Sequence, residues 1–433
     1  MRTAVEETPE RAKEAIKARR ATYTRLAGWG VGLLLLIALP WFSSTSMVSL
    51  YNQIGIAIIF ALAYNLLLGH SGLLSFGHAV YFGVGAFWTI QLMSWVSDGL
   101  FYFPTPLVPL AGGLGGLIFG IVLGFVCVRR HGTIFALITL AIGELMTALT
   151  LMLNDMSGGE EGISAWREPW MGLMFGQGLQ VYYVILAWVI VCAALMYAFT
   201  RTPFGRIMLA VRDNAERAQF IGYSTFLVRL TVFAVSGLFS GVAGGLLAFS
   251  NELINYEVMS LNESAAVLFN TYIGGATYFS GPIIGAVVLA SLQLNVSIFT
   301  AAWLVYQALL FIIVIMFIPT GLSGLIYSHG PVIKRRLMGI LAPAYALAAV
   351  PGVILFLTGV FIIEFFYGWS HHGYAATPFP LFGVSWAPAS LWPWLVMVVG
   401  LAAGLGGLRY VVPIVRERWA RVNAHLSGEE PAA

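Results

Sequence analysis

Runs of about twenty apolar residues recur along almost the whole chain, and they constrain its fold more than any other feature. The hydrocarbon core of a bilayer is roughly 30 Å thick, so a helix needs about 20 apolar residues to cross it. Of the 433 residues, 59% are hydrophobic and only 9% are charged, whereas a soluble domain needs far more charge to cover its surface. The sequence therefore predicts an all-α bundle of transmembrane helices.

The apolar runs predict about twelve spans, the last two of which form a C-terminal extension. Their expected positions are 26–42, 48–68, 76–96, 107–128, 133–153, 179–199, 227–249, 265–279, 282–298, 302–318, 341–363 and 390–408. The eighth and ninth are separated only by GGATYFSGPIIG (274–285). That stretch predicts either a tight cytosolic turn or an unwound break within the membrane, because irregular backbone at membrane depth must be buried in protein or line a cavity.

Basic residues determine the expected orientation. With the N-terminus inside and all twelve spans crossing, 21 of the 22 Lys and Arg residues fall on the inner side, and only Arg167 lies outside. Cytoplasmic loops carry such an excess of positive charge. Removing one crossing at 274–285 would place Lys334, Arg335 and Arg336 outside, so we keep both spans and expect both termini in the cytoplasm.

Three parts of the chain follow from this scheme. Residues 1–26 are expected to form a cytosolic N-terminal segment, with Thr8 as a helix cap and Pro9 at the first helical position. No small-residue cleavage site follows, so we expect the first apolar run to stay as an anchor. Residues 27–326 form the transmembrane core, and residues 327–433 form the extension with its basic cytosolic tail.

Several chemistries have no support in the sequence. Cys127 and Cys192 lie in separate apolar runs, so neither a disulfide framework nor a metal site is expected. There is no phosphate-binding G-x-x-x-x-G-K-[ST] loop, no H-E-x-x-H pair and no G-x-S-x-G turn. The net charge of +3 is dispersed among the loops, which argues against nucleic-acid binding. We expect no catalytic residue and no cofactor, and the chain is not expected to be an enzyme.

Glu144 is the only acid that the predicted spans place deep in the membrane. A charge at the bilayer centre costs about 3 kcal/mol even on modest scales, so such a group is a functional candidate. The alternative is a carboxyl that ties helices together, and the sequence leaves both open. For His78 we favour a structural role, in which the imidazole bonds a neighbouring carbonyl.

Small residues recur at every fourth position in two expected helices. One carries Gly112, Gly116, Gly120 and Gly124, and the other carries Gly237, Gly241 and Gly245. Such stripes allow helix backbones to approach closely, which drives association in lipid. We therefore expect these helices to pack tightly.

The most polar internal stretch is RTPFGRIMLAVRDNAERAQFIGYS, residues 201–224. It is expected to form one amphipathic helix on the inner membrane surface, with Thr202 as cap, Pro203 at the first position and Gly222 as its stop. Ile207, Val211, Ala215 and Ala218 recur at helical spacing and would face the bundle. The charged face would either meet a partner or be a solvated connector held by Arg212/Glu216 and Asp213/Arg217 pairs.

Five motifs, in order, resemble the permease subunits of bacterial ABC importers for branched-chain amino acids, in particular the M-type subunit. They are NLLLGHSGLLSFGHAVYFGVGAF (65–87), LITLAIGELM (137–146), TPFGRIMLAVRDNAERAQFIGYS (202–224), GVAGGLLA (241–248) and YIGGATYFSGPIIGA (272–286). The resemblance covers roughly residues 45–326. In that family the polar stretch is the loop that couples the permease to an ATP-binding subunit, which would assign this role here to Arg206, Ala210, Arg212, Asp213, Asn214, Ala218 and Gly222.

The resemblance also implies partners and a location. These are a second, H-type permease subunit, two ATP-binding subunits that supply the missing phosphate-binding loop, and a periplasmic solute-binding protein, all at the bacterial inner membrane. The glycine-rich interruptions at 69–77 and 274–285 would line the route. Candidate polar groups along it are Asn65, Ser71, Ser75, His78, Glu144 and Asn270, although each is as well suited to bonding between helices.

The sequence leaves the substrate, the mechanism and the role of the C-terminal extension open. Urea, short-chain amides and aromatic acids are alternative substrates of such a permease, and an ion-coupled secondary transporter using Glu144 is the alternative mechanism. Family members commonly end soon after PTGLSGLI (319–326), whereas this chain continues. For the extension we expect a peripheral hairpin packed on the bundle, with Trp369, Trp386 and Trp392 at the membrane interface.

Overall fold

The computed structural model describes residues 30–176, 178–374 and 377–427. The predicted N-terminal segment 1–26, with its Thr8 cap, lies outside these residues. The helices of the first half are α2 (Thr45–Ser71), α3 (Ala79–Ser97), α4 (Pro109–Cys127), α5 (Thr133–Met152), α6 (Asn154–Ser157), α7 (Gly178–Arg201), α8 (Pro203–Asp213) and α9 (Ala215–Phe220). Those of the second half are α10 (Thr225–Asn251), α11 (Leu261–Gly274), α12 (Gly281–Ser297), α13 (Trp303–Phe317), α14 (Gly321–Lys334), α15 (Met338–His371) and α16 (Trp392–Ser427).

Strands and 3-10 turns are short. Strand β1 (Ile163–Ser164) pairs antiparallel with β2 (Leu253–Ile254), and β3 (Phe379–Leu381) pairs antiparallel with β4 (Val384–Trp386). Three 3-10 turns are η1 (Leu39–Phe42), η2 (Thr105–Leu107) and η3 (Tyr256–Met259). The chain is a helical bundle, as predicted.

Eight helices of the described chain are long and apolar enough to cross a membrane: α2, α3, α4 together with η2, α5, α7, α10, α15 and α16. The pair α13 and α14, bent by 50° between them, would make a ninth. The expected spans at 26–42, 265–279 and 282–298 correspond to shorter helices, namely Gly30–Phe42, α11 and α12. A multi-pass helical membrane protein is thus confirmed, while the count of twelve and the sidedness of the termini stay predictions.

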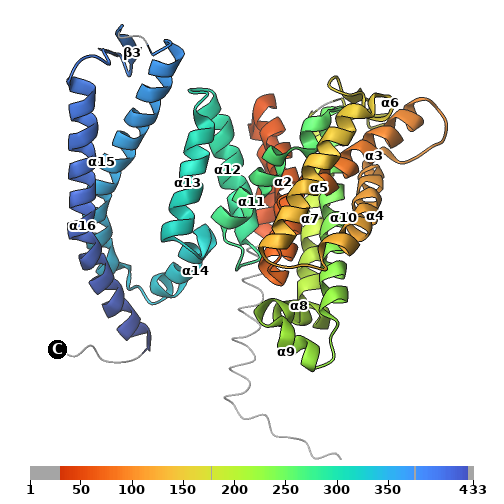
Figure 1. Ribbon diagram of the computed structural model, residues 1–433, viewed down its shortest axis with the longest axis horizontal. Helices are drawn as coiled ribbons and strands as arrows, with labels where there is room; N and C mark the ends of the chain where they lie inside the picture. The colour runs from red at the N-terminus through yellow and green to blue at the C-terminus, as the bar shows by residue number, and fades with distance from the viewer. Residues whose placement is uncertain (1–29, 177, 375–376, 428–433) are drawn as a thin grey trace, which may run out of the picture.

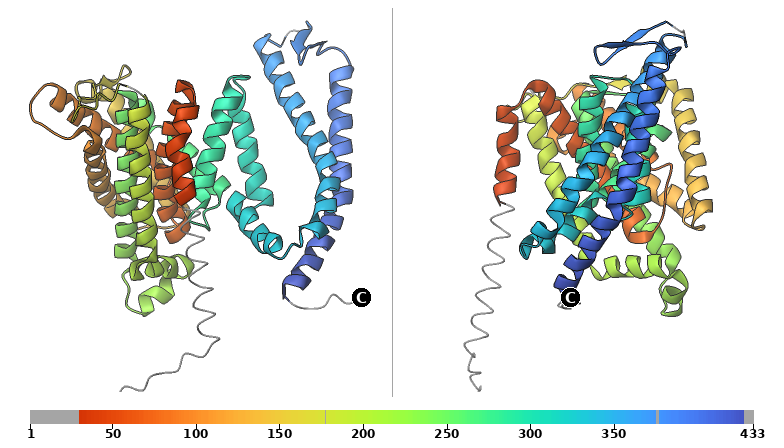
Figure 2. Two further views of the ribbon diagram at one scale, coloured as in Figure 1. Left: turned by 180° about the vertical axis from the view of Figure 1, so that it is seen from behind. Right: turned by 90° about the vertical axis from the view of Figure 1, so that its left-hand side faces the viewer.

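The helices form three groups in a row (Figure 1). The first contains α2 to α5, α7 and α10, the second contains α11 to α14, and the third is the hairpin of α15 and α16. Both views in Figure 2 place α8 and α9 at the same end of the molecule as the described end of α16. This is the end that the basic residues predict to be cytosolic, and we call it the inner end.

Helices α4 and α10 pack backbone to backbone along their glycines, as the small-residue stripes predict. A Cβ atom added to Gly116 would lie 2.2 Å from the Gly237 carbonyl oxygen, and one added to Gly241 would lie 2.1 Å from that of Gly112. No side chain fits at such distances. The centre of the molecule is therefore held by close approach of small residues.

The C-terminal extension forms the predicted hairpin, but most of it stands apart from the core. Phe361, Phe365, Phe379 and Met397 form its own buried cluster at the outer end, with Trp369 and Trp386 packed against them. Trp392 is exposed. At the inner end a second cluster joins the hairpin to α14 through Val332, Leu341 and Val422. The hairpin contacts the core at its foot, through α14, and at the bond between Tyr306 and Glu364. Only 17% of the most apolar stretch of each of its helices is buried within the described chain.

Candidate functional site: two chain breaks and a surface segment

The first glycine-rich interruption is an irregular stretch between α2 and α3. Helix α2 ends at Ser71 and is capped by Gly72, whose φ of +69° is readily adopted only by glycine. Beyond it, the Phe76 amide donates to Thr139 Oγ1 at 3.1 Å, and the Ala79 amide donates to Ser264 Oγ at 3.0 Å. Side chains of α5 and α11 thus satisfy backbone groups that a continuous helix would have bonded itself.

The second interruption lies between α11 and α12. Gly275 has a φ of +104°, and a Cβ there would lie 2.3 Å from the Thr320 carbonyl oxygen. Gly274 packs equally closely on Gly281. This break therefore rests directly on the start of α14.

The two breaks touch each other. A Cβ on Gly69 would lie 2.4 Å from the Ala276 carbonyl oxygen and 2.2 Å from Asn65 Oδ1. The Asn65 side chain is 1% exposed, and both of its amide atoms lack a hydrogen-bond partner within the described chain. A buried amide without partners is costly, and this one lies where the two breaks meet.

Of the neighbouring polar side chains, Ser71 is hydrogen-bonded, whereas Ser75, like Asn65, is buried without a partner among the described residues. Ser71 donates to the Leu67 carbonyl of its own helix at 2.7 Å. Ser75 is fully buried, and its hydroxyl has no partner among the residues that the structure covers, while its carbonyl accepts from the Tyr64 hydroxyl at 2.9 Å. Asn270 is buried, and its carbonyl oxygen lies against Gly285.

His78 is fully buried at a junction of three helices. Its Nε2 atom lies 2.9 Å from Ser240 Oγ and 3.1 Å from Ser236 Oγ, both on α10. Ser236 in turn donates to the Ala63 carbonyl of α2 at 2.6 Å. The ring also stacks on Phe60. The ring thus joins helices, but through serine hydroxyls and not through the carbonyl that the sequence led us to expect, and its Nδ1 atom has no partner among the described residues.

Glu144 lies away from this junction. It is on the exposed side of α5 and has no hydrogen bond or ion pair to any described residue. It is also not the only acid inside a long apolar helix. Glu364 lies within α15, where its Oε1 atom accepts from the Tyr306 hydroxyl at 2.7 Å. The predicted span 341–363 stops one residue before it, whereas α15 continues to His371.

Residues 201–224 form two short helices, not the single one predicted. Thr202 caps α8 by accepting from the Gly205 amide at 3.3 Å, and Pro203 takes the first position, both as predicted. Asn214 then adopts an extended conformation and caps α9, accepting from the Arg217 amide at 2.8 Å. Gly222 follows α9 with a φ of +98°, in line with its predicted role as a stop. The chain turns at Asn214 because an asparagine cap satisfies the amides of a new helix.

The residues predicted to face the bundle are covered, as expected. The ion pairs predicted between residues four apart are absent among the described residues. Val211 and Ala218 are buried, and Ile207 and Ala215 are half-buried. Arg212 pairs with its neighbour Asp213 at 2.9 Å, instead of with Glu216. Asp213 does not pair with Arg217 in the described structure, because Asn214 breaks the helical spacing between them.

Arg212 also makes a contact that the sequence does not suggest. Its Nη1 atom donates to the Gly69 carbonyl, 143 residues away, and its side-chain carbons lie against Gly72. Gly69 is the residue that touches Ala276 in the other break. One arginine therefore connects the surface segment to the point where both breaks meet.

The outward side of the segment combines charge with two large apolar side chains. Arg206 and Ala210 are exposed, and Phe220 and Ile221 are 91% and 70% exposed. We call Phe220 and Ile221 the apolar tip. The sequence analysis did not predict it, although two large apolar residues directly after a polar run could have indicated it. Exposed aromatic and aliphatic groups on a polar surface indicate a protein contact.

At the opposite end, a single arginine fixes the long loop between α5 and α7. Arg167 pairs with Glu252 at 3.1 Å, and its Nη1 atom donates to the Phe249 and Ser250 carbonyls at the end of α10. Burial lowers the pKa of the Arg167 guanidinium, and the charge of Glu252 opposes that shift. This loop is thus attached to the most buried helix of the core.

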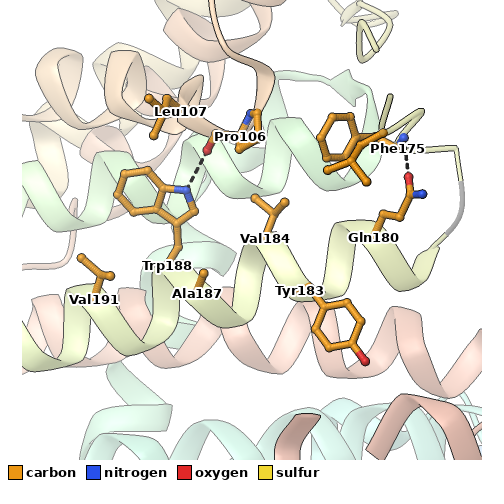
Figure 3. Close-up of a pocket in the computed structure, with 10 residues that line it drawn as sticks. Pro106, Leu107, Phe175, Gln180, Tyr183, Val184, Ala187, Trp188 and Val191 are labelled. Carbon is orange, nitrogen blue, oxygen red and sulfur yellow. Dashed lines mark hydrogen bonds between the residues drawn. The ribbon is translucent and has the colours of Figure 1, made fainter. Parts of the chain in front are cut away.

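A pocket of about 550 Å³ lies on the outer part of α7, away from both breaks. Figure 3 shows Trp188 donating to the Pro106 carbonyl, at 3.0 Å, and Gln180 accepting from the Phe175 amide. Its other lining groups are almost all apolar. The pocket suits hydrocarbon and offers no charged group for an amino acid. In the part of the chain that the structure describes, no group of three His, Cys, Asp or Glu side chains could hold a metal ion.

Comparison with known proteins identifies relatives of this architecture. A family model described as branched-chain amino acid transport system / permease component matches residues 46–319. The high-affinity branched-chain amino acid transport system permease protein LivM of Escherichia coli (strain K12) is 29% identical over 281 residues. That alignment covers 59% of this chain and 65% of the relative, so the match spans less than two thirds of LivM.

Relatives with other printed substrates also match. The L-arabinose ABC transporter permease protein AraH of Azospirillum brasilense is 27% identical over 191 residues, covering 42% of this chain and 53% of AraH. The probable branched-chain amino acid transport permease protein LivH of Methanocaldococcus jannaschii is 24% identical over 241 residues, covering 52% of this chain and 74% of LivH. No solved structure matches significantly.

Proposed function

Since the chain belongs to the branched-chain amino acid transport system permease family, we propose that it is one permease subunit of an ATP-driven importer. It forms half of a translocation pathway in the bacterial inner membrane. An H-type permease subunit forms the other half, two ATP-binding subunits drive the movement, and a periplasmic solute-binding protein delivers the solute. The chain itself performs no chemical reaction.

The contact from Arg212 to Gly69 carries this proposal. The segment 201–224 projects from the inner end of the bundle, where a cytosolic motor would reach it (Figure 1). Its exposed Phe220 and Ile221 provide an apolar tip. Its only bond to the first break passes through Arg212 among the hydrogen bonds of the described residues. A displacement of α8 therefore pulls on the Gly69 carbonyl and on the touching break at Ala276.

We propose an amino acid as the transported solute. Branched-chain amino acids or other amino acids are favoured, because LivM matches more of this chain than AraH does. Asn65 presents an amide that suits a zwitterion without carrying a charge that would hold it tightly. Urea, short-chain amides, aromatic acids and sugars are the competing solute classes.

Arg212→Gln tests the coupling. In proteoliposomes containing all subunits, we expect solute uptake to fall at least tenfold while the complex still assembles and hydrolyses ATP. Arg130→Gln is the matched control, because Arg130 is an exposed cation at the same end, in the turn between α4 and α5. Uptake in the control should stay within twofold. Normal uptake by the Arg212 variant would refute the proposed lever.

A second candidate function rests on Glu144. An exposed carboxylate in the middle of α5 is unfavourable in lipid, so its face meets either the second permease subunit or water. An ion-coupled secondary transporter would use this group as a proton carrier. Uptake by the purified chain alone, driven by a proton gradient and abolished by Glu144→Gln, would favour this function. Uptake that requires ATP-binding subunits and survives Glu144→Gln would exclude it.

A further inference from the structure

The foot of the C-terminal hairpin is fixed to α14 by several independent contacts. Arg335 Nη1 donates to the carbonyls of His425 and Leu426, near the end of α16, at 3.1 Å each. The Tyr345 hydroxyl lies 2.8 Å from His329 Nε2 and accepts from Trp419 Nε1 at 2.9 Å. With the buried Val332 and its neighbours, these bonds hold the ends of α14 and α16 in one arrangement.

This junction gathers positive charge. We call the set Lys334, Arg335, Arg336, Arg418 and Arg421 the basic corner. The first three are exposed at the turn from α14 to α15, and Arg418 and Arg421 flank the Trp419 and Val422 side chains that contact α14 and α15. Glu417 is the only acid in this stretch of α16, and it pairs with Arg421, with both side chains more than half exposed. Such a pair is weak, so the corner keeps a strong positive field.

The corner lies where the membrane surface must be. Helix α16 has 36 residues, which is about 54 Å at 1.5 Å per residue, whereas the hydrocarbon core is roughly 30 Å thick. Apart from Arg409, its residues stay largely apolar as far as Val415, and Arg416, Arg418 and Arg421 follow. Ile333 and Met338, beside the cations, are 60% and 37% exposed. Cations next to exposed apolar side chains are typical of a membrane interface.

We propose that the basic corner binds the phosphate head group of anionic phospholipids in the inner leaflet. Guanidinium groups bind phosphate oxygens in pairs, and clustered basic residues next to a spanning helix attract anionic lipid. A docked ATP-binding subunit is a poorer occupant. The corner lies under the hairpin, at the far side of the molecule from α8 and α9 (Figure 2), and its exposed Ile333 suits acyl chains.

The test uses the full-length permease in nanodiscs, with spin-labelled phosphatidylglycerol and phosphatidylcholine as probes. We expect the wild-type chain to select the anionic probe. Arg418→Gln combined with Arg421→Gln should reduce that selectivity by about fivefold for each cation removed. Lys334→Gln combined with Arg336→Gln should do the same, and it spares the backbone bonds of Arg335. Both variants should remain monodisperse.

Arg129→Gln combined with Arg130→Gln is the matched control, since it removes two cations from the α4–α5 turn at the same end. We expect it to change selectivity less than twofold. Equal losses in corner and control variants would overturn the proposal, because they would show a general charge effect. Displacement of the probe by inorganic phosphate at constant ionic strength would also overturn it. So would loss of ATP-binding subunits from the corner variants with unchanged lipid selectivity.

Discussion

The central helices and the C-terminal hairpin differ in how much of their surface is buried by the rest of the chain. In the most apolar stretch of α10, 83% of residues are buried inside the chain, whereas the corresponding share is 17% for both α15 and α16. Helix α10 is lined with glycine and serine and approaches its neighbours at backbone distance. The hairpin presents large apolar side chains, such as Phe356 and Val398, to its surroundings. In this molecule, the helix with the most small residues along its contacts is also the one that is most buried.

This difference in packing determines how far the movement of one helix is passed to its neighbours. In the core, small residues leave no gap, so a shift in one helix is passed to the next. In the hairpin, the large side chains are mostly exposed, so a shift there meets few other groups of the described chain. The contact between Gly69 and Ala276 is of the first kind, and Arg212 reaches it from the surface segment.

The largest expected contrast is between two Gly→Ala substitutions. A methyl group on Gly241 would lie 2.1 Å from the Gly112 carbonyl, whereas one on Gly359 in α15 would meet nothing within 4 Å. Gly241→Ala should destabilise the protein by about 3 kcal/mol, the upper end of overpacking costs. Gly359→Ala should be neutral or slightly stabilising, since alanine favours a helix.

Thermal unfolding in detergent, with the yield of monodisperse protein, measures this contrast. If both variants unfold at the wild-type temperature, the α4–α10 contact is not close in the folded protein. If both are destabilised equally, the hairpin is as tightly packed as the core. Either result removes the distinction drawn here.

A pair of histidines gives the next largest effect. His78 is fully buried and bonded to Ser236 and Ser240, whereas His329 is half-buried and bonded to Tyr345 at the hairpin foot. His78→Ala should cost about 2 kcal/mol, because it leaves a cavity and an unpaired Ser240 hydroxyl. His329→Ala should cost about 1 kcal/mol. Denaturation of the two variants in the same detergent tests this order, and a larger loss from His329→Ala would contradict it.

The sequence predicted features that local patterns determine. Apolar runs, the glycine stripes and the cap at Thr202 each depend on residues close in the chain. The stripes and the cap agree with the structure, and the runs predicted its helical membrane character but not the number of spans. The turn at Asn214 was missed because the surrounding residues favour one continuous helix, and the cap bond to Arg217 outweighs that preference. Sequence spacing alone does not reveal which preference prevails.

The candidate site depended on contacts that no local pattern contains. The glycine-rich stretches predicted the two breaks, but not that Gly69 touches Ala276 or that Arg212 reaches Gly69. Among the six polar residues proposed for the route, the sequence could not distinguish Asn65, whose amide is unpartnered in the described structure, from Ser71, which bonds its own helix. Glu364 lies inside α15, one residue beyond the predicted span, and its partner Tyr306 is 58 residues away in the chain.

The smallest expected effect comes from the largest deletion. Ending the chain at Leu337 removes α15 and α16, and with them the bond between Tyr306 and Glu364 and the cover over Val332. It also removes the Tyr345 hydroxyl from His329 and the His425 and Leu426 carbonyls from Arg335. Water can replace these partners at the inner end, so the core should lose only about 1 kcal/mol. Adding Val332→Ser to the truncated chain separates exposure of that side chain from loss of the hairpin.

We expect the truncated chain to assemble with its partners and to transport at a rate within about threefold of wild type. Failure of the truncated chain to fold, with or without Val332→Ser, would show that the hairpin is a structural part of the core and would contradict the division between the two regions.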